Sequence, residues 1–183
     1  MLLQKEKSCL LIIDVQEKLT PYVQHADSLI SGCLWLMRLA TELDIPLVVT
    51  EQYAKGLGPT IELLRNVMPG KVEIDKLFFS SYRDPLFQKH WQMLNKKQAV
   101  LAGIETHVCV LQTALDLRAE GVDVFVVVDA VSSRHVRDYE CALQRMQQEG
   151  VRLVTREMVF FEWLEQAGKP TFKTLSKVFV NRS

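Results

Sequence analysis

The sequence alternates short aliphatic runs with longer segments of helical periodicity, and this alternation most constrains the fold. Cys9–Ile13 is continuously apolar, without two-residue alternation, which predicts a strand buried on both faces. From Asp27 to Leu43, apolar residues recur every three or four positions, which predicts an amphipathic helix capped by Asp27 or Ser28. Strand and helix alternate about six times, so we expect an α/β fold, with a six-stranded, mostly parallel sheet in a three-layer, Rossmann-like arrangement.

The remaining elements are expected from the same pattern. Further strands are expected over residues 47–50, 72–74, 99–103, 123–128 and 151–155. Further helices are expected over residues 60–68, 85–94, 108–120, 138–149 and 157–166, with a loop over 51–59. Residues 171–178 are expected to form a last helix or a docked tail. Asp84 is the expected cap of the helix that begins at Pro85. No repeat or linker interrupts the 183 residues, which predicts a single domain over 1–183.

Composition narrows the class of protein. Lys and Arg number 22 and Asp and Glu number 22, so the basic excess typical of a nucleic-acid binder is missing, and a charge-neutral chain favours a homo-oligomer. The four cysteines form no C-x-x-C pair, which argues against zinc or disulfide frameworks and favours a cytoplasmic location. The aliphatic runs are much shorter than a membrane span of about 20 residues, and Asp14 interrupts the first one too early for a signal peptide.

Chemically useful side chains follow several of the expected strands. Parallel sheets bind ligands at the carboxyl ends of their strands. Asp14, Glu51 and Lys76 each end or follow a strand, as do Gly103–Cys109 and Asp129. We therefore expect these residues along one edge of the sheet.

Cys109, Lys76 and Asp14 each allow two interpretations. Cys109 lies near an expected helix start, where backbone N–H groups lower the pKa of a thiol and could hold an oxyanion, so it could be a nucleophile. Alternatively, it is a small buried apolar residue of the core. Lys76 stabilises a thiolate or is solvated. Asp14 ends an aliphatic run and therefore needs a partner, or it caps a turn. Together they could perform nucleophilic catalysis, with Cys109 attacking a carbonyl and Asp14 as the general acid and base.

Three motifs in this order resemble the isochorismatase-like cysteine hydrolase family: Leu11–Gln16, Lys76 and Ala102–Val110. Thr50–Pro59 and Asp129–Arg134 look most like isochorismatase-domain-containing proteins. The resemblance implies the isochorismatase-like hydrolase fold and a catalytic triad of Asp14, Lys76 and Cys109. It also implies a cis peptide between Ile104 and Glu105 and an oxyanion hole formed by the amides of Glu105 and Cys109.

The sequence departs from the metal-dependent nicotinamidases of that family, which use an Asp and several His after the second strand. Residues 51–60 contain neither, so we expect no metal and no cofactor. Relatives that hydrolyse a vinyl ether can work without the cysteine, so the presence of Cys109 favours a small amide, carbamate or related acyl substrate. We expect the substrate pocket to be lined by Gln16, Glu51, Gln52, Tyr53 and Phe79.

Other interpretations stay open from the sequence alone. Asp14 could hydrolyse an enol ether by acid chemistry with Cys109 idle. His107 could pair with Cys109 as a dyad, although residues two apart on a helix point to different faces. A redox role would need a resolving cysteine close to Cys109. The chain could also be a non-catalytic interaction protein that keeps the fold.

Overall fold

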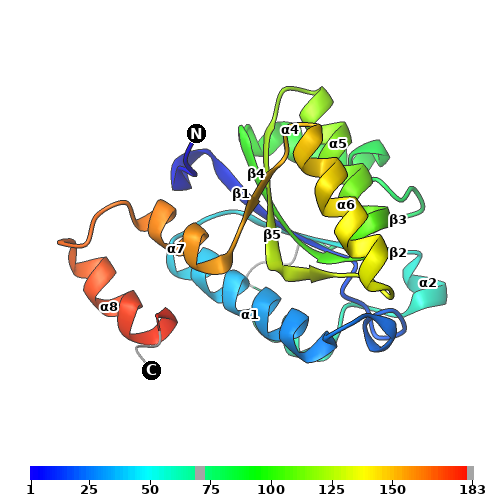
Figure 1. Ribbon diagram of the computed structural model, residues 1–183, viewed down its shortest axis with the longest axis horizontal. Helices are drawn as coiled ribbons and strands as arrows, with labels where there is room; N and C mark the ends of the chain where they lie inside the picture. The colour runs from blue at the N-terminus through cyan, green and yellow to red at the C-terminus, as the bar shows by residue number, and fades with distance from the viewer. Residues whose placement is uncertain (69–72, 181–183) are drawn as a thin grey trace.

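A twisted, parallel six-stranded sheet lies between two layers of helices (Figure 1), which confirms the expected α/β architecture. The computed structural model describes residues 1–68 and 73–180. The strand order is β3-β2-β1-β4-β5-β6. The strands are β1 (Ser8–Ile13), β2 (Leu47–Gln52), β3 (Glu73–Lys76), β4 (Gln98–Ile104), β5 (Asp123–Ser132) and β6 (Arg152–Val154).

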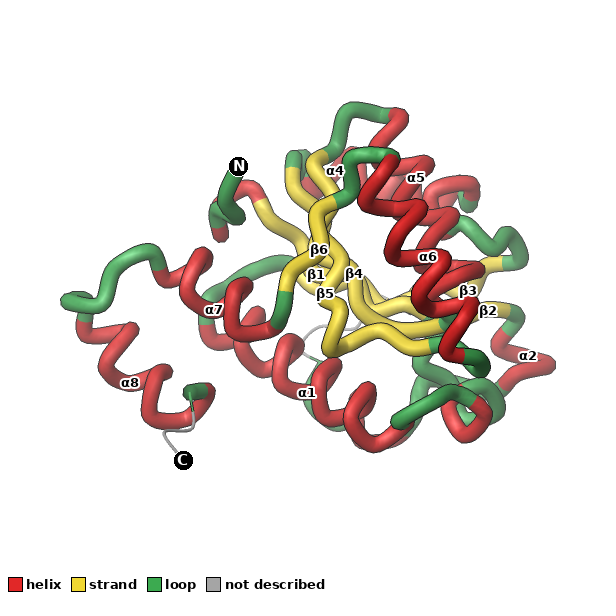
Figure 2. The backbone as a smooth tube through the Cα atoms, viewed as in Figure 1, coloured by secondary structure: helices red, strands yellow, loops and turns green. Residues whose placement is uncertain are grey.

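The helices cover both faces of the sheet (Figures 1 and 2). They are α1 (Ala26–Glu42), α2 (Ala54–Leu57), α3 (Glu62–Arg65), α4 (Pro85–Leu94), α5 (Leu111–Ala119), α6 (Val136–Gln148), α7 (Arg156–Leu164) and α8 (Pro170–Phe179). Apolar residues of α1 and α7 pack in one core cluster, and those of α4, α5 and α6 pack in another. The sheet therefore has a separate core on each face.

Strand β1 runs through the centre of the molecule and is buried on both faces, as its continuous apolar run predicts. Leu10 and Ile12 join the core on the α1 side, whereas Leu11 and Ile13 join the core on the α5 side. Each of these side chains is fully buried. Asp14 follows Ile13 directly and therefore lies at the carboxyl end of the central strand.

The helix starts differ in how well the sequence predicts them. Asp84 accepts hydrogen bonds from the amides of Leu86 and Phe87, which confirms it as the cap of α4. The prediction that Asp27 or Ser28 caps α1 is wrong. Helix α1 begins one residue earlier, after His25, which has a left-handed φ of 51° and makes no side-chain cap bond.

Three boundaries near the carboxyl edge of the sheet were wrongly predicted. The expected loop over 51–59 contains the short helix α2. The helix expected from Val108 begins as a π-helical turn, Thr106–Val110, and α5 follows from Leu111. Strand β5 continues past Asp129 to Ser132, with a register shift against β4. Residue 72 of the third expected strand lies outside the described residues. Within the described part of the chain, no helix is both long and apolar enough to cross a bilayer.

Candidate active site

Asp14 and Lys76 form a buried ion pair at the carboxyl edge of the sheet. The Lys76 Nζ lies 2.8 Å from the Asp14 Oδ2, and neither side chain is exposed. Strand β2 lies between the two, since β1 pairs with β2 and β2 pairs with β3. The hydroxyl of Thr50, at the end of β2, donates to the Asp14 Oδ1 over 2.7 Å. Lys76 is thus not a solvated surface residue, and Asp14 has the partner that a buried carboxylate requires.

The ammonium group of Lys76 is surrounded by oxygen acceptors. Besides Asp14, it donates to the Gln52 Oε1 over 2.7 Å and lies 3.3 Å and 3.2 Å from the carbonyl oxygens of Phe78 and Phe79. The three protons of an ammonium are fully engaged by such a set. Lys76 is therefore held in one position at the floor of the site.

Cys109 lies beside this ion pair, in the π-helical turn between β4 and α5. Its Sγ is 3.9 Å from the Gln52 Oε1, and the residue is 6% exposed. Burial raises the pKa of the Cys109 thiol, the charge of Asp14 raises it further, and Lys76 acts in the opposite direction. The expectation of a lowered pKa is therefore wrong, because desolvation outweighs the effects that favour a thiolate.

The turn that carries Cys109 begins at a cis peptide between Ile104 and Glu105. The Glu105 carboxylate accepts bonds from the backbone amide and the Nε of Arg134, both over 3.0 Å. Gly103, at the end of β4, has a φ of 116°, and a side chain there would collide with the backbone of Ile13 in β1. The glycine thus allows the ends of β1 and β4, which carry Asp14 and Cys109, to approach each other closely.

The five residues expected to line a substrate pocket have different surroundings. Gln52 contacts both Lys76 and Cys109. Tyr53 and Phe79 are 48% and 54% exposed. The Gln16 amide instead binds the backbone of Gln52 and the carbonyl oxygen of Gly58, and the Glu51 carboxylate accepts from the amide and hydroxyl of Thr60. Gln16 and Glu51 therefore brace the loop that follows β2, and their polar atoms are directed to the protein itself.

Asp129 does not reach the edge where Asp14 and Lys76 meet, contrary to the prediction. Strand β5 is longer than expected, and the Asp129 carboxylate bonds to the amide and the Nε of Arg156. It is thus tied to the start of α7.

His107 is also oriented away from a dyad with Cys109. Its Nδ1 lies 3.0 Å from the Ser133 Oγ, and its Nε2 lies 3.9 Å from the Asp138 Oδ2. Both ring nitrogens therefore face the start of α6. Among residues 1–68 and 73–180, no three His, Cys, Asp or Glu side chains gather as a metal-binding group.

Two contributors were missing from the expected set of site residues. Thr50 holds the Asp14 carboxylate, and its place at the end of a strand adjacent to β1 was a usable signal. Arg134, which is 29 residues away in the sequence, donates a hydrogen bond to the Glu105 carboxylate and holds it in place. No local sequence pattern predicts that contact, because it depends on how the loop after β5 folds over the turn.

Comparisons with known proteins agree with this architecture. A family model described as the isochorismatase domain matches residues 8–158. Mouse isochorismatase domain-containing protein 2A is 39% identical over 176 residues, covering 94% of this chain and 82% of that protein. The structure of a MAR1 ribonuclease from Caenorhabditis elegans is 36% identical, with a TM-score of 0.92, over 100% of this chain and 94% of that one. The Escherichia coli YcaC gene product, described as an octameric hydrolase of unknown specificity, is 28% identical with a TM-score of 0.92, over 98% and 91% of the two chains.

Proposed function

The chain belongs to the isochorismatase family and has its hydrolase fold, and from this premise we propose that it is a cysteine-dependent hydrolase of a small amide-like molecule. The substrate class comprises amides, carbamates and related acyl compounds, and the reaction passes through a thioester at Cys109. One observation carries the proposal: a buried thiol lies beside a buried carboxylate–ammonium pair. Such a thiol is a nucleophile only if a neighbouring group removes its proton, and Asp14 is suited to that task.

In the first half of the reaction, Asp14 accepts the proton of the Cys109 thiol while the sulfur attacks the substrate carbonyl carbon. The carbonyl oxygen becomes an oxyanion, and the backbone amides of Glu105 and Cys109 are the proposed donors to it. The intermediate then collapses. The carbon–nitrogen bond breaks, the protonated Asp14 gives its proton to the leaving nitrogen, and an acyl group remains on the sulfur as a thioester.

In the second half, Asp14 accepts a proton from water as the water oxygen attacks the thioester carbonyl. The carbon–sulfur bond breaks, the carboxylic acid leaves, and the proton returns to sulfur. Lys76 takes no part in these proton transfers. Its charge balances Asp14 in the resting site and stabilises sulfur when negative charge develops there. Gln52 holds both the ammonium and the thiol, which supports a positioning role.

The surroundings of the thiol support a small substrate. Cys109 is only 6% exposed, so a large polymer could present little more than one functional group to it. Tyr53 and Phe79, both about half exposed, are the proposed rim of the entrance. The chemistry above uses only side chains and backbone amides of this chain and water, so we propose that it needs no metal or cofactor.

Assembly and location are part of the proposal. The E. coli relative is described as octameric, and this chain has a formal net charge of zero, which supports self-association as a homo-oligomer. The four cysteines are free, which fits a reducing, cytoplasmic compartment.

Mass spectrometry of the intact protein tests the proposal. The protein is incubated with a panel of small amides, carbamates and aldehydes, and trapped adducts are mapped to individual cysteines. We expect an adduct at Cys109 that requires Lys76. An aldehyde reports on the same sulfur, because the thiol adds to its carbonyl carbon to form a thiohemiacetal. The variant Cys33→Ala, which removes another buried thiol, is the matched control and should keep the adduct. A panel that leaves Cys109 unmodified while exposed Cys141 reacts would contradict the proposal.

Two other activities are separated by the variant Cys109→Ala. Hydrolysis of an enol ether by Asp14 alone would persist in this variant, whereas acyl transfer would be lost.

Cleavage of RNA, the activity in the name of the C. elegans relative, is tested with a labelled oligonucleotide. We expect no cleavage that depends on Cys109, because the chain lacks the basic excess that phosphate binding favours.

A further inference from the structure

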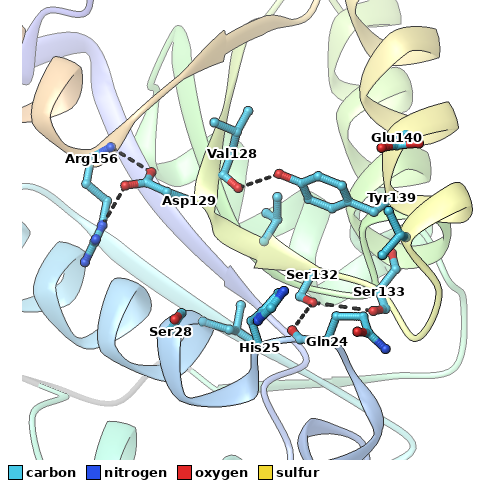
Figure 3. Close-up of a pocket in the computed structure, with 13 residues that line it drawn as sticks. Gln24, His25, Ser28, Val128, Asp129, Ser132, Ser133, Tyr139, Glu140 and Arg156 are labelled. Carbon is cyan, nitrogen blue, oxygen red and sulfur yellow. Dashed lines mark hydrogen bonds and ion pairs between the residues drawn. The ribbon is translucent and has the colours of Figure 1, made fainter.

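A cavity lies at the edge of the sheet, beside the last part of β5. It has a volume of about 490 Å³ and lies between the start of α1, the end of β5 and the start of α6 (Figure 3). The cavity exists because β6 pairs only with Phe125–Val127, so the last part of β5 runs on without a neighbouring strand on that side. None of the residues that line it is Asp14, Lys76 or Cys109.

The floor and sides of the cavity are mainly apolar. Leu29 from α1, Val131 from β5 and Val136 from α6 contribute aliphatic walls. Leu29 and Val131 are 2% and 6% exposed, whereas Val136, at the mouth, is 54% exposed. Pockets of this size and character bind small organic molecules.

The charged groups around the cavity leave one negative charge unbalanced. Asp129 is paired with Arg156 over 2.8 Å, and in Figure 3 the Arg156 guanidinium lies on the other side of Asp129 from Tyr139. Glu140, on α6, has no ion-pair partner within the described part of the chain. The pKa of Tyr139 is raised by burial and by the charge of Asp129.

The ring of Tyr139 forms a wall of the cavity, and its hydroxyl group opposes the binding of an extended peptide there. Its hydroxyl donates to the carbonyl oxygen of Val128 over 2.8 Å (Figure 3). An extended peptide could pair with the open edge of β5 only by displacing this bond. The face of an aromatic ring attracts cations, and Glu140 follows Tyr139 directly on the same helix.

We propose that this cavity is a second ligand site, which binds a small apolar molecule carrying a single ammonium group. The apolar body of the ligand contacts Leu29, Val131 and Val136. The ammonium lies between the Tyr139 ring and the Glu140 carboxylate. The site shares no residue with the triad, so this proposal does not rest on the proposed hydrolysis.

Titration of the full-length protein with benzylammonium, followed by ligand-observed NMR, tests this site. Benzyl alcohol, which lacks the charge, and benzoate, which reverses it, are the comparison ligands. For a ligand of this size we expect a Kd of about 1 mM. Benzyl alcohol should bind at least about threefold more weakly, and benzoate should show no saturable binding.

Paired variants locate the binding. Glu140→Gln should weaken benzylammonium binding about threefold, whereas Glu149→Gln, which removes a carboxylate just beyond the other end of α6, should not. Val136→Trp should abolish binding by filling the mouth, whereas Leu86→Trp, at an exposed position in the first turn of α4, should not. Thermal unfolding confirms that each variant is folded.

Cys109→Ala should bind benzylammonium as tightly as the unaltered protein, which separates this site from the proposed active site. Three results would overturn the inference: equal affinity for benzylammonium and benzyl alcohol, binding that survives Val136→Trp, or no saturable binding up to about 10 mM. If a second copy of the chain covers the cavity, the third result is obtained, and sedimentation velocity identifies it as the cause.

Discussion

Two buried thiols, Cys109 and Cys33, show what distinguishes a candidate nucleophile from a core residue. Cys33 lies in α1, is completely buried and donates to the carbonyl oxygen of Ala130 over 3.7 Å. Burial raises its pKa to about 12. Cys109 also has a raised pKa and is nearly as buried. Burial and pKa therefore do not separate the two residues.

The difference lies in what each sulfur faces. Cys33 is surrounded by the apolar core between α1 and the sheet. Cys109 has the Asp14–Lys76 pair and Gln52 beside it. A carboxylate next to a protonated thiol can accept its proton at the moment of attack. Within residues 1–68 and 73–180, the Cys33 sulfur has only the Ala130 carbonyl oxygen as a hydrogen-bond partner, which cannot act as such a base. The comparison teaches that a neighbouring carboxylate, and not a low resting pKa, marks the candidate nucleophile here.

Replacing each of the two thiols by alanine in separate variants gives the largest expected effect, which is on the rate of hydrolysis. Cys109→Ala should lower hydrolysis of any reactive amide at least about 10⁴-fold, as removal of a nucleophile does in other enzymes. Cys33→Ala should leave the rate within about twofold and instead lower the free energy of unfolding by about 1 kcal/mol, because it leaves a small cavity. Initial rates and urea unfolding of both variants measure this. Equal loss of activity in the two would erase the distinction.

The ion pair beside Cys109 gives the next largest effect. Lys76→Met leaves the Asp14 carboxylate buried without its partner, which should lower the free energy of unfolding by about 3–5 kcal/mol. Lys89→Met, on the exposed face of α4, should change it by less than about 0.5 kcal/mol. The double variant Asp14→Asn, Lys76→Met removes both charges and should recover part of the loss. Urea unfolding measures all three, and an unchanged midpoint for Lys76→Met would show that water reaches the pair.

Much of the fold follows from the sequence because its determinants are local. The unbroken apolar run before Asp14 specifies a strand buried on both faces, and Asp84 before Pro85 specifies the start of α4. Since parallel strands end at one edge, these local patterns also bring Asp14 and Lys76 together. The meeting of the two residues was therefore predictable.

What the sequence could not predict depends on contacts between distant segments. The thiol pKa was misjudged because the burial of Cys109 depends on the packing of α5 and α6 over the turn, and burial opposes ionisation. Asp129 was misplaced because β5 continues after a register shift with β4, which has no local signature. The capping of α1 was misassigned because the chain enters the helix through a left-handed His25.

Alkaline pH should lower the free energy of unfolding, because the core thiols have raised pKa values in the folded protein. Burial raises the pKa of Cys9 and Cys33 to about 12, whereas a thiol in the unfolded chain ionises near 9. Above pH 9 the unfolded chain loses protons that the folded chain keeps, so stability falls as pH rises towards 12. Each thiol should contribute a slope of about 1.4 kcal/mol per pH unit.

The variant Cys33→Ala isolates this contribution. Its free energy of unfolding should fall less steeply between pH 9 and pH 11 than that of the unaltered protein, by about 1.4 kcal/mol per pH unit. Cys141→Ala, which removes an exposed thiol, should leave the slope unchanged. Urea unfolding at pH 8, 9, 10 and 11 provides the comparison. Parallel curves for Cys33→Ala and the unaltered protein would mean that this thiol ionises in the folded state as easily as in the unfolded one.

The smallest expected effect concerns the turn that carries Cys109. Arg134→Ala removes the guanidinium that holds the Glu105 carboxylate over 3.0 Å, but it keeps the bond from the Arg134 backbone amide. Because one of two fastenings remains and the pair is partly exposed, we expect alkylation of Cys109 by iodoacetamide to accelerate only about twofold, with little change in stability. Arg152→Ala removes another partly exposed pair, with Asp123, at the starts of β6 and β5, which do not carry the thiol, and should leave the rate unchanged. If both variants accelerate alkylation equally, the effect is general loosening, and the arginine does not position the turn.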